Sequence, residues 1–571
     1  MSHAGETVAV MTSTIYRATL FAAAVGIGHG ACGDNLKATV EPEPDAPTAP
    51  DTTALLKSKV KTIVFIYAEN RGFDNIYGLF PGANGIPGVN PSATGTIAKQ
   101  IDRDAAGTVL PTLPLAWGGV TAPGALPVIT QDMSRGDLPN APYELKATYG
   151  ALGFAGTATI THDLVHRFFN NQMQINGGKN DRFAAFSDVG GLVMGYHDGS
   201  DMAMWKVAQH YVLADNFFIG AFGGSFLNHQ YLICACAPEY PDADTAAAKP
   251  TISVLQTGAQ MLALAPASPA SALDGPPVYL PGATAGVSAD ANLTPKNYFG
   301  DGTFRAVNTM QPAYQPSGNA PAASDTTKLY ADPAKPNTLP PQVEPTIGDQ
   351  LDAKNVTWKW YAGAFASTTA AATTDRAFPP VTAPGVGPNY QFHHHPFNYY
   401  AKFDPTTGAA ARQAHFDDEA KLEADITAGT LPEVVFYKPE GDLNQHPGYA
   451  SVDAGDKHIA DLVAKLEASP QFANMVIVVT YDENGGWWDH VAPPKADLLG
   501  PGSRVPAIII SPFAKAGTID HTQYDTGSIL RLINRRYDIT PLPGITARDA
   551  ALVAAGGHAM GDLTNALDLT K

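Results

Sequence analysis

Two groups of polar residues follow apolar segments that are typical of buried strands. Residues 63–67 (IVFIY) lead into Glu69 and Asn70, and residues 475–480 (MVIVVT) lead into Asp482 and Glu483. The carboxyl ends of parallel strands meet at one edge of a sheet, where α/β proteins bind ligands. Carboxylate and amide oxygens at such an edge suit a hard or borderline divalent cation. On the first segment alone an ordinary loop is an equal alternative, but the repeated design favours a metal site.

A pair of glycines precedes a hydroxyl side chain in the sequence GGSFLNH, residues 223–229. The apolar residues that follow predict a helix over 226–236, with Ser225 at its start. Glycines let the backbone approach an anion, and the first amides of a helix stabilise that anion. Ser225 is therefore either an ordinary N-cap or a nucleophile, and its position is compatible with both roles.

Histidines with polar or aromatic neighbours form a third group, made up of His166, His393, His394, His395 and His446. A single histidine such as His166 is more often structural than functional. Three adjacent histidines are different, because a core would have to satisfy every one of them. These three histidines are therefore expected either on the surface or in a functional site. The aromatic residues around them favour a functional site.

The order of helical and strand-like segments predicts an α/β fold with a largely parallel central sheet flanked by helices. Helices are expected over 200–210, 347–351, 458–466 and 527–537, and further strands over 211–218, 431–437 and 505–510. Residues from about 239 to 342 are rich in Pro, Ala, Gly and Thr with little apolar periodicity. We interpret this segment as an insertion that covers the site or lies on the surface.

Net charge and cysteine content argue against nucleic-acid binding and against a disulfide framework. The chain of 571 residues carries a net charge of −18 and has no basic run, so nucleic acid is an unexpected partner. Its three cysteines do not make a disulfide framework, and Cys234 and Cys236 are expected to be small apolar core residues.

The amino-terminal residues have the pattern of an export signal. With Met11 as the start, Arg17 precedes the apolar residues 18–27, and small residues precede Cys32. We expect a signal segment over 1–32, a disordered linker over 33–58 and a catalytic domain over 59–571. Cleavage as a lipoprotein, with a lipid on Cys32 as the only membrane attachment, and plain secretory cleavage both remain open. The expected location is therefore periplasmic, cell-surface or secreted.

Several motifs in one order resemble those of a known family. AENRGFDNIYG, DLVHRFFNNQMQINGG, GGSFLNH, HHHPF, NQHPGYASV and YDENGGWWDHV are similar to motifs of the bacterial phosphoesterases that include AcpA-type acid phosphatases and non-haemolytic phospholipases C. The GGSFLNH motif and residues 347–365 look closest to the Burkholderia-type acid phosphatases. The resemblance runs from about residue 61 to residue 539, and it implies an alkaline-phosphatase-like fold.

The resemblance also implies a set of site residues. One divalent cation (Mg, Ca, Mn or Zn) would be held by Glu69, Asn70, Ser225, Asp482 and Glu483. Ser225 would be the nucleophile, and Asn70, His166, His393, His394 and His446 would surround the phosphoryl group. His395 stands where relatives often have Asn or Gln, and Pro396 sets the register that selects His393 and His394.

The resulting expectation is a metal-dependent acid phosphatase that hydrolyses small phosphomonoesters through a phosphoserine at Ser225. Charged histidines would stabilise the phosphoryl oxygens and place the pH optimum on the acid side. The alternative within the family is a phospholipase C-type phosphodiesterase acting on phosphatidylcholine-like substrates. An alternative from another class is a surface lipoprotein that binds phosphorylated ligands without turnover.

Overall fold

The computed structural model describes residues 51–258, 260–280, 291–315, 319–365 and 390–571. The expected signal segment and most of the expected linker lie outside these residues. The linker boundary at residue 58 is wrong, because α1 (Thr53–Lys59) is a helix whose Leu56 is buried and which packs on α12 (Thr526–Tyr537). Residues from Thr52 to Lys571 form one compact unit.

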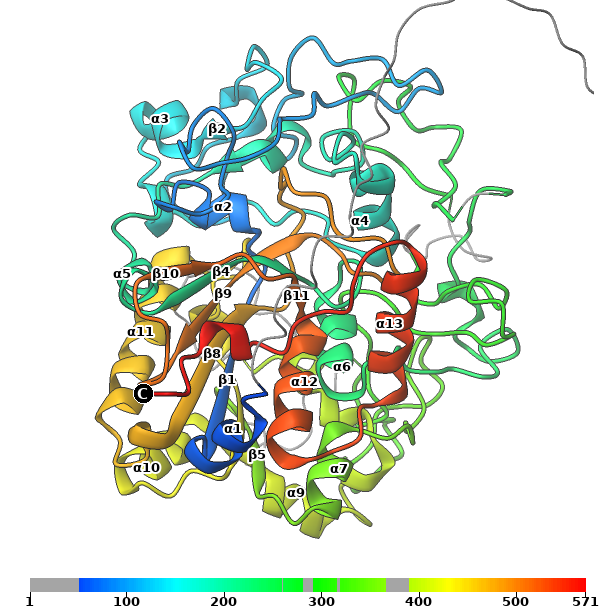
Figure 1. Ribbon diagram of the computed structural model, residues 1–571. Helices are drawn as coiled ribbons and strands as arrows, with labels where there is room; N and C mark the ends of the chain where they lie inside the picture. The colour runs from blue at the N-terminus through cyan, green and yellow to red at the C-terminus, as the bar shows by residue number, and fades with distance from the viewer. Residues whose placement is uncertain (1–50, 259, 281–290, 316–318, 366–389) are drawn as a thin grey trace, which may run out of the picture. The chain divides into compact units, whose positions relative to one another are not determined.

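The unit is built on a nine-stranded sheet (Figure 1). In spatial order its strands are β10 (Thr518–Asp520), β4 (Val212–Phe218), β9 (Arg504–Ile510), β8 (Met475–Tyr481), β1 (Thr62–Ala68), β7 (Val434–Lys438), β5 (Trp358–Ala362) and β6 (Phe416–Asp418), with β11 (Tyr524–Asp525) also paired to β4. All pairs are parallel except those of β9 with β4 and with β8. A short second sheet pairs β2 (Tyr143–Glu144) with β3 (Gly195–Tyr196).

Helices cover both faces of the large sheet. On one face α5 (Ala203–His210), α10 (Glu419–Ala428) and α11 (Val452–Ala468) pack side by side; on the other lie α1, α6 (Ser225–Cys234), α7 (Ile347–Ala353) and α12 (Figure 1). The other α-helices in the described part of the chain are α2 (Phe73–Tyr77), α3 (Leu145–Tyr149), α4 (Phe168–Ile175), α9 (Ala409–His415) and α13 (Pro543–Ala554). The predicted α/β fold with a largely parallel sheet flanked by helices is confirmed.

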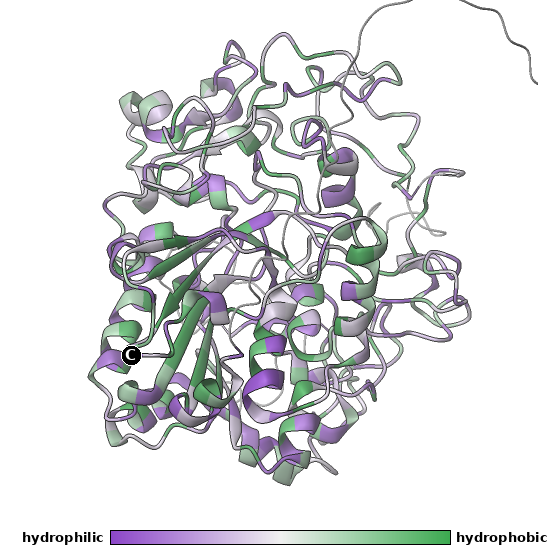
Figure 2. Cartoon of the chain, viewed as in Figure 1, coloured by the Kyte–Doolittle hydropathy of each residue, from purple (hydrophilic) through white to green (hydrophobic). Residues whose placement is uncertain are grey.

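Burial explains why the central strands lack alternation. Every residue of β1, β8 and β9 is buried, and these strands are strongly hydrophobic in Figure 2. A strand covered by helices on both faces must be apolar on both, so continuous Val and Ile runs replace the usual period of two. The polar residues of these segments are consequently concentrated at the strand ends.

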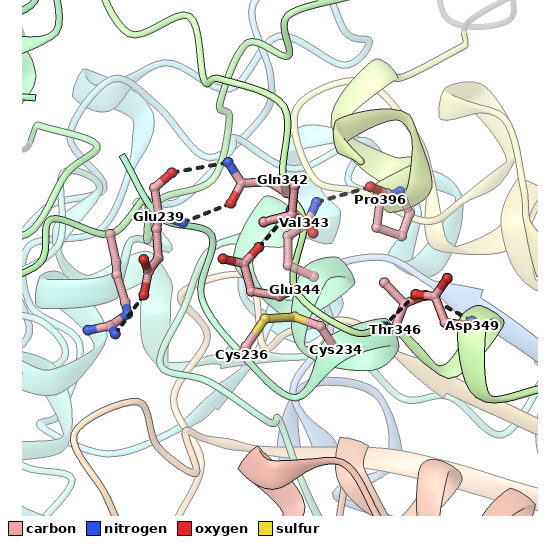
Figure 3. The surroundings of a disulfide bond; sticks show 11 residues. Cys234, Cys236, Glu239, Gln342, Val343, Glu344, Thr346, Asp349 and Pro396 are labelled. Carbon is pink, nitrogen blue, oxygen red and sulfur yellow. Dashed lines mark hydrogen bonds and ion pairs between the residues drawn. A yellow bond between two sulfur atoms is a disulfide. The ribbon is translucent and has the colours of Figure 1, made fainter. Parts of the chain in front are cut away.

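The insertion over residues 239–342 is closed at its base by a pair of side-chain contacts. Gln342 donates from Nε2 to the carbonyl of Glu239 at 3.0 Å, and its Oε1 accepts from the Glu239 amide at 2.9 Å (Figure 3). The two ends of this segment therefore leave the domain at the same place.

Next to this base lies a disulfide between Cys234 and Cys236 (Figure 3). The expectation of two free apolar cysteines is therefore wrong. Helix α6 ends at Cys234, and Ala235 takes a left-handed conformation with φ 50°, which turns the chain back and brings the two sulfur atoms together.

Within the described part of the chain, no helix combines the length and the apolar character needed to cross a bilayer.

Candidate functional site

The register of the central strands brings the two predicted carboxylate pairs together. Ala68 pairs with Tyr481, so Glu69 and Asp482 follow the ends of neighbouring parallel strands. The Asp482 amide donates to the Ala68 carbonyl at 3.0 Å, and the Asn70 amide donates to Asp482 Oδ1 at 3.2 Å. These residues and Glu483 are completely buried. Residues more than 400 positions apart in sequence thus form one polar cluster.

Ser225 reaches the same edge because of the direction of β4. Strand β9 is antiparallel to both β4 and β8, so β4 runs parallel to β8 and β1. After β4, Gly223 (φ 34°) and Gly224 (φ 85°) turn the chain into α6. A Cβ on Gly224 would lie 2.9 Å from the carbonyl carbon of Asn308, so only glycine fits against this part of the insertion.

The hydroxyl of Ser225 points into the carboxylate cluster. Its Oγ donates to Glu483 Oε1 at 2.9 Å and lies 3.5 Å from Glu69 Oε2. Gly224 is the N-cap of α6, and Ser225 is the first residue of the helix. No side chain caps the start of this helix. The N-cap interpretation is therefore wrong. The next amide, that of Phe226, donates to the Thr309 carbonyl at 3.0 Å, so the insertion and not an anion satisfies it.

The chemistry of the cluster fits a divalent cation. Burial raises the pKa of Glu69 and Glu483 well above the usual range, with the Asp482 charge adding to the effect, and burial also raises the pKa of Asp482. Among the described residues, Asp482 Oδ2 and Glu483 Oε2 have no hydrogen-bond partner. Three buried carboxylates, two of which have an unsatisfied oxygen, are the donor set that a positive ion stabilises.

The side chain of Asn70 links the carboxylates to two histidines. One end of its amide lies 2.7 Å from Glu69 Oε2 and 3.1 Å from Asp482 Oδ1, and the other end lies 2.9 Å from His446 Nε2 and 3.3 Å from His166 Nε2. With the oxygen on the carboxylate side, three oxygens converge as they would around a cation. With the nitrogen there, hydrogen bonds satisfy the carboxylates instead.

His166 and His446 are oriented by backbone carbonyls. Nδ1 of His166 contacts the carbonyl of Leu164, and Nδ1 of His446 contacts that of Pro447. When Nδ1 carries the proton, Nε2 has the lone pair and faces the site. Any second proton on these rings is therefore placed where it can be donated to a bound ligand.

Burial disfavours the charged form of the site histidines in the ligand-free protein, which opposes the expectation of charged imidazolium groups. Burial lowers the pKa of His166 to about 4 and that of His393 to about 3, and it holds the pKa of His394 and His446 well below the usual range. The physical cause is the loss of hydration of the imidazolium form. A bound phosphoryl dianion would raise the pKa values of these histidines.

The three adjacent histidines divide between the site and the core. His394 Nε2 lies 3.3 Å from Glu69 Oε1, and the ring of His393 lies next to it, with centroids 4.0 Å apart. The ring of His395 packs against Phe416 at 4.4 Å, and its Nδ1 meets the Tyr390 hydroxyl at 2.9 Å. The structure thus brings His393 and His394 to the cluster and leaves His395 outside it.

The low pKa values of the histidines predict a loss of stability in acid. Between the usual value of 6.5 and about 4, the folded protein keeps His166 neutral while the unfolded chain binds a proton. The free energy of unfolding therefore falls as the pH falls through this window. In the ligand-free protein, His166→Asn should remove roughly 3 kcal/mol of this decrease by pH 4. Chemical denaturation at pH 7 and pH 4 measures it, with exposed His558→Asn as the control. Coinciding pH profiles of His166→Asn and the unmodified protein would contradict the assignment.

Two residues of the cluster were missed by the sequence analysis. Lys438, the last residue of β7, is buried and its Nζ contacts Glu69 Oε1. His229, one turn into α6, lies with Nε2 4.0 Å from Glu69 Oε1 and Nδ1 3.9 Å from Asp482 Oδ2. The signal for Lys438 was a single charge at the end of an apolar strand, the pattern already used for Glu69 and Asp482.

Asp489 and His490 belong to a separate buried network. Arg504 on β9 lies 3.1 Å from Asp489 Oδ1 and 3.0 Å from Asp74 Oδ1, and His490 Nδ1 lies 2.7 Å from Asp74 Oδ2. The network ties the loop after β8 to the helix that follows Asn70. It therefore fixes the two ligand-bearing segments relative to each other.

A cavity of about 690 Å³ lies on the outer side of His166 and His446. Asp163, Arg167 and Phe392 line it from the domain, and the insertion contributes Tyr279, Val278, Thr309, Met310, Asn292 and Asn337. Residues of the insertion therefore line the space beside His166 and His446.

Comparison with known proteins gives a family match and several partial relatives. A family model described as the Phosphoesterase family matches residues 60–540. Phospholipase C B of Mycobacterium tuberculosis is 32% identical over 155 residues, which cover 23% of this chain and 29% of that protein. Non-haemolytic phospholipases C of Pseudomonas aeruginosa and Burkholderia pseudomallei are 27% and 28% identical over 26% and 30% of this chain and 25% and 27% of those proteins. The matched regions thus span less than a third of these relatives.

Among solved structures, a protein of the alkaline phosphatase superfamily from Vibrio parahaemolyticus matches 60% of this chain and 63% of its own, with 10% identity and a TM-score of 0.26.

Proposed function

Because the chain belongs to the phosphoesterase family, we propose that it is a metal-dependent phosphoric ester hydrolase with Ser225 as its nucleophile. The observation that carries the proposal is the position of Ser225 Oγ, 2.9 Å from Glu483 Oε1 and at the edge where Glu69 and Asp482 converge. Ser225 is buried and does not cap α6. Helix capping therefore does not explain why its hydroxyl faces three carboxylates.

The residues that would hold the cation are Glu69, Asn70, Ser225, Asp482 and Glu483. When bound, a divalent cation lowers the cost of ionising a serine hydroxyl and neutralises charge on phosphoryl oxygens. Oxygen ligands favour Mg, Ca or Mn, and Zn also accepts carboxylates. The proposal therefore commits to one divalent cation without naming the metal.

The protein's own groups supply orientation and proton positions. Glu483 Oε1 accepts the Ser225 hydroxyl hydrogen and so fixes the orientation of the hydroxyl group. Attack of Ser225 on phosphorus, with loss of the alcohol, gives a phosphoserine that water then hydrolyses. His166 and His446 carry any second proton on Nε2, facing the site, where it can reach a phosphoryl oxygen or the leaving alkoxide.

Within this class we propose an acid phosphatase acting on phosphomonoesters. A monoester dianion has three terminal oxygens, and four buried histidines near the cluster offer enough donors for them. The leaving alcohol would occupy the cavity that the insertion covers. The second candidate is a phospholipase C-type phosphodiesterase, which the names of the relatives from Mycobacterium, Pseudomonas and Burkholderia support.

Turnover of two chromogenic substrates distinguishes the candidates. We expect kcat/KM for p-nitrophenyl phosphate to exceed that for p-nitrophenylphosphorylcholine by at least about tenfold, since a diester leaves one buried donor without an acceptor. The measurement is made on the metal-loaded protein at several pH values. The reverse ratio would establish the phosphodiesterase, and phosphate binding without turnover of either substrate would favour a binding protein.

A further inference from the structure

Lys438 occupies an unusual position for a lysine. It ends β7, between β1 and β5, so its side chain starts at the sheet edge that also carries Glu69. The residue is 2% exposed, and its ammonium group contacts Glu69 Oε1. A buried lysine is costly unless a carboxylate pairs with it, so this contact determines where the charge lies.

The two oxygens of Glu69 face different surroundings. Oε2 lies on the side of Asn70 and Ser225, where the proposed metal would bind. Oε1 faces Lys438 together with His394 Nε2 at 3.3 Å and His229 Nε2 at 4.0 Å. Among the described residues, neither of these two nitrogens has a hydrogen-bond partner.

The second side has the composition of another metal site. Ligand atoms of Glu69, His229 and His394 all lie within 4.8 Å of one another. One carboxylate and two imidazoles are a donor set that zinc and related metals accept, and a carboxylate between two such positions is a feature of two-metal sites. Here the ammonium group of Lys438 is already in contact with that carboxylate.

The charge balance points the same way. Glu69, Asp482 and Glu483 carry three negative charges when ionised, and Lys438 offsets one of them. The remainder equals the charge of one divalent ion. Two divalent ions beside the ammonium group would leave a buried excess of positive charge, which a protein interior disfavours.

We infer that the ammonium group of Lys438 is the second cation of this site, so that the protein binds one divalent metal ion and not two. Removing the lysine then opens a second metal position made by Glu69, His229 and His394. The inference rests on the proposed metal site, but its readout is the number of bound ions and not the rate of hydrolysis.

Metal content tests the inference directly. The full chain is stripped with a chelator, equilibrated with zinc by dialysis and analysed for zinc per chain. We expect one equivalent in the unmodified protein, two in Lys438→Ala, and one again when His229→Asn is combined with Lys438→Ala. Lys359→Ala removes a lysine of the neighbouring strand β5 that pairs with Asp417, and it should leave the count at one.

The possible zinc counts distinguish the role of Lys438 from the proposed metal site of the hydrolase. Two equivalents in the unmodified protein, or one in a folded Lys438→Ala, would overturn the inference. Zero in the unmodified protein and one in Lys438→Ala would support the role of Lys438 while overturning the proposed metal site of the hydrolase. Circular dichroism checks folding, and Lys438→Gln replaces the alanine variant if the latter does not fold, with the same gain of one equivalent expected.

Discussion

Replacing Ser225 with alanine should reduce kcat by about 10³-fold or more, because the nucleophile of a covalent mechanism has no substitute in the site. The fold should survive the change. Ser225 does not cap α6, and alanine is favourable in a helix. The lost hydrogen bond to the buried Glu483 should lower the free energy of unfolding by about 1–3 kcal/mol.

The measurement combines turnover with trapping of the intermediate. Acid quenching during hydrolysis of a ³²P-labelled monoester should leave label on the unmodified protein and none on Ser225→Ala, while inorganic phosphate still binds the variant. Ser511→Ala is a matched control, since Ser511 is equally buried but donates to the Met475 carbonyl, where β8 begins at the opposite edge of the sheet. Unchanged turnover in Ser225→Ala would remove this residue from the mechanism.

Replacing Asp482 with asparagine should weaken metal binding by at least about 10²-fold and lower activity with it, because one negative charge is removed from a buried cation site. Asparagine keeps an oxygen that accepts from the amides of Asn70 and Glu483, so the local backbone is retained. The raised pKa of Glu69, Asp482 and Glu483 adds a second expectation. Metal binding must displace protons from these carboxyls, so affinity should fall as the pH is lowered.

Titration calorimetry in two buffers of different ionisation enthalpy measures both affinity and proton release. Asp456→Asn serves as the control, because Asp456 is a buried acid on α11 that accepts from the Ala203 and Met204 amides and is not one of the proposed ligands. It should lower thermal stability without changing metal affinity. Full metal affinity in Asp482→Asn would place the ion elsewhere.

The strand ends were predictable because burial on both faces leaves a distinctive pattern. Continuous apolar runs in β1 and β8 identified Glu69 and Asp482, and the parallel register of these strands then brings the two residues together. The direction of β9 was not predictable, because an apolar run reads the same in either orientation. That direction matters, since it makes β4 parallel to β8 and so delivers Ser225 to the correct edge.

Sequence analysis did not identify the residues whose role depends on tertiary contacts. Lys438 ends a short strand whose neighbours in space are set by pairing, and His229 lies in an apolar helix where a histidine is normally structural. The lowered pKa of His166 follows from its burial in the folded protein, which no local sequence pattern reveals. The disulfide was missed because a spacing of two residues closes only when Ala235 adopts a left-handed backbone conformation.

The two ends of the 239–342 segment meet at Glu239 and Gln342, and this arrangement has a consequence for evolution. Residues of this segment line the cavity that we propose for the departing alcohol, whereas the proposed catalytic groups lie at the strand ends of the sheet. Selection can therefore change which esters are accepted by changing the sequence of a segment that leaves and re-enters the domain at one place. The residues at the strand ends can be kept meanwhile. Chimaeras that exchange this segment between homologues are a natural route to new specificities.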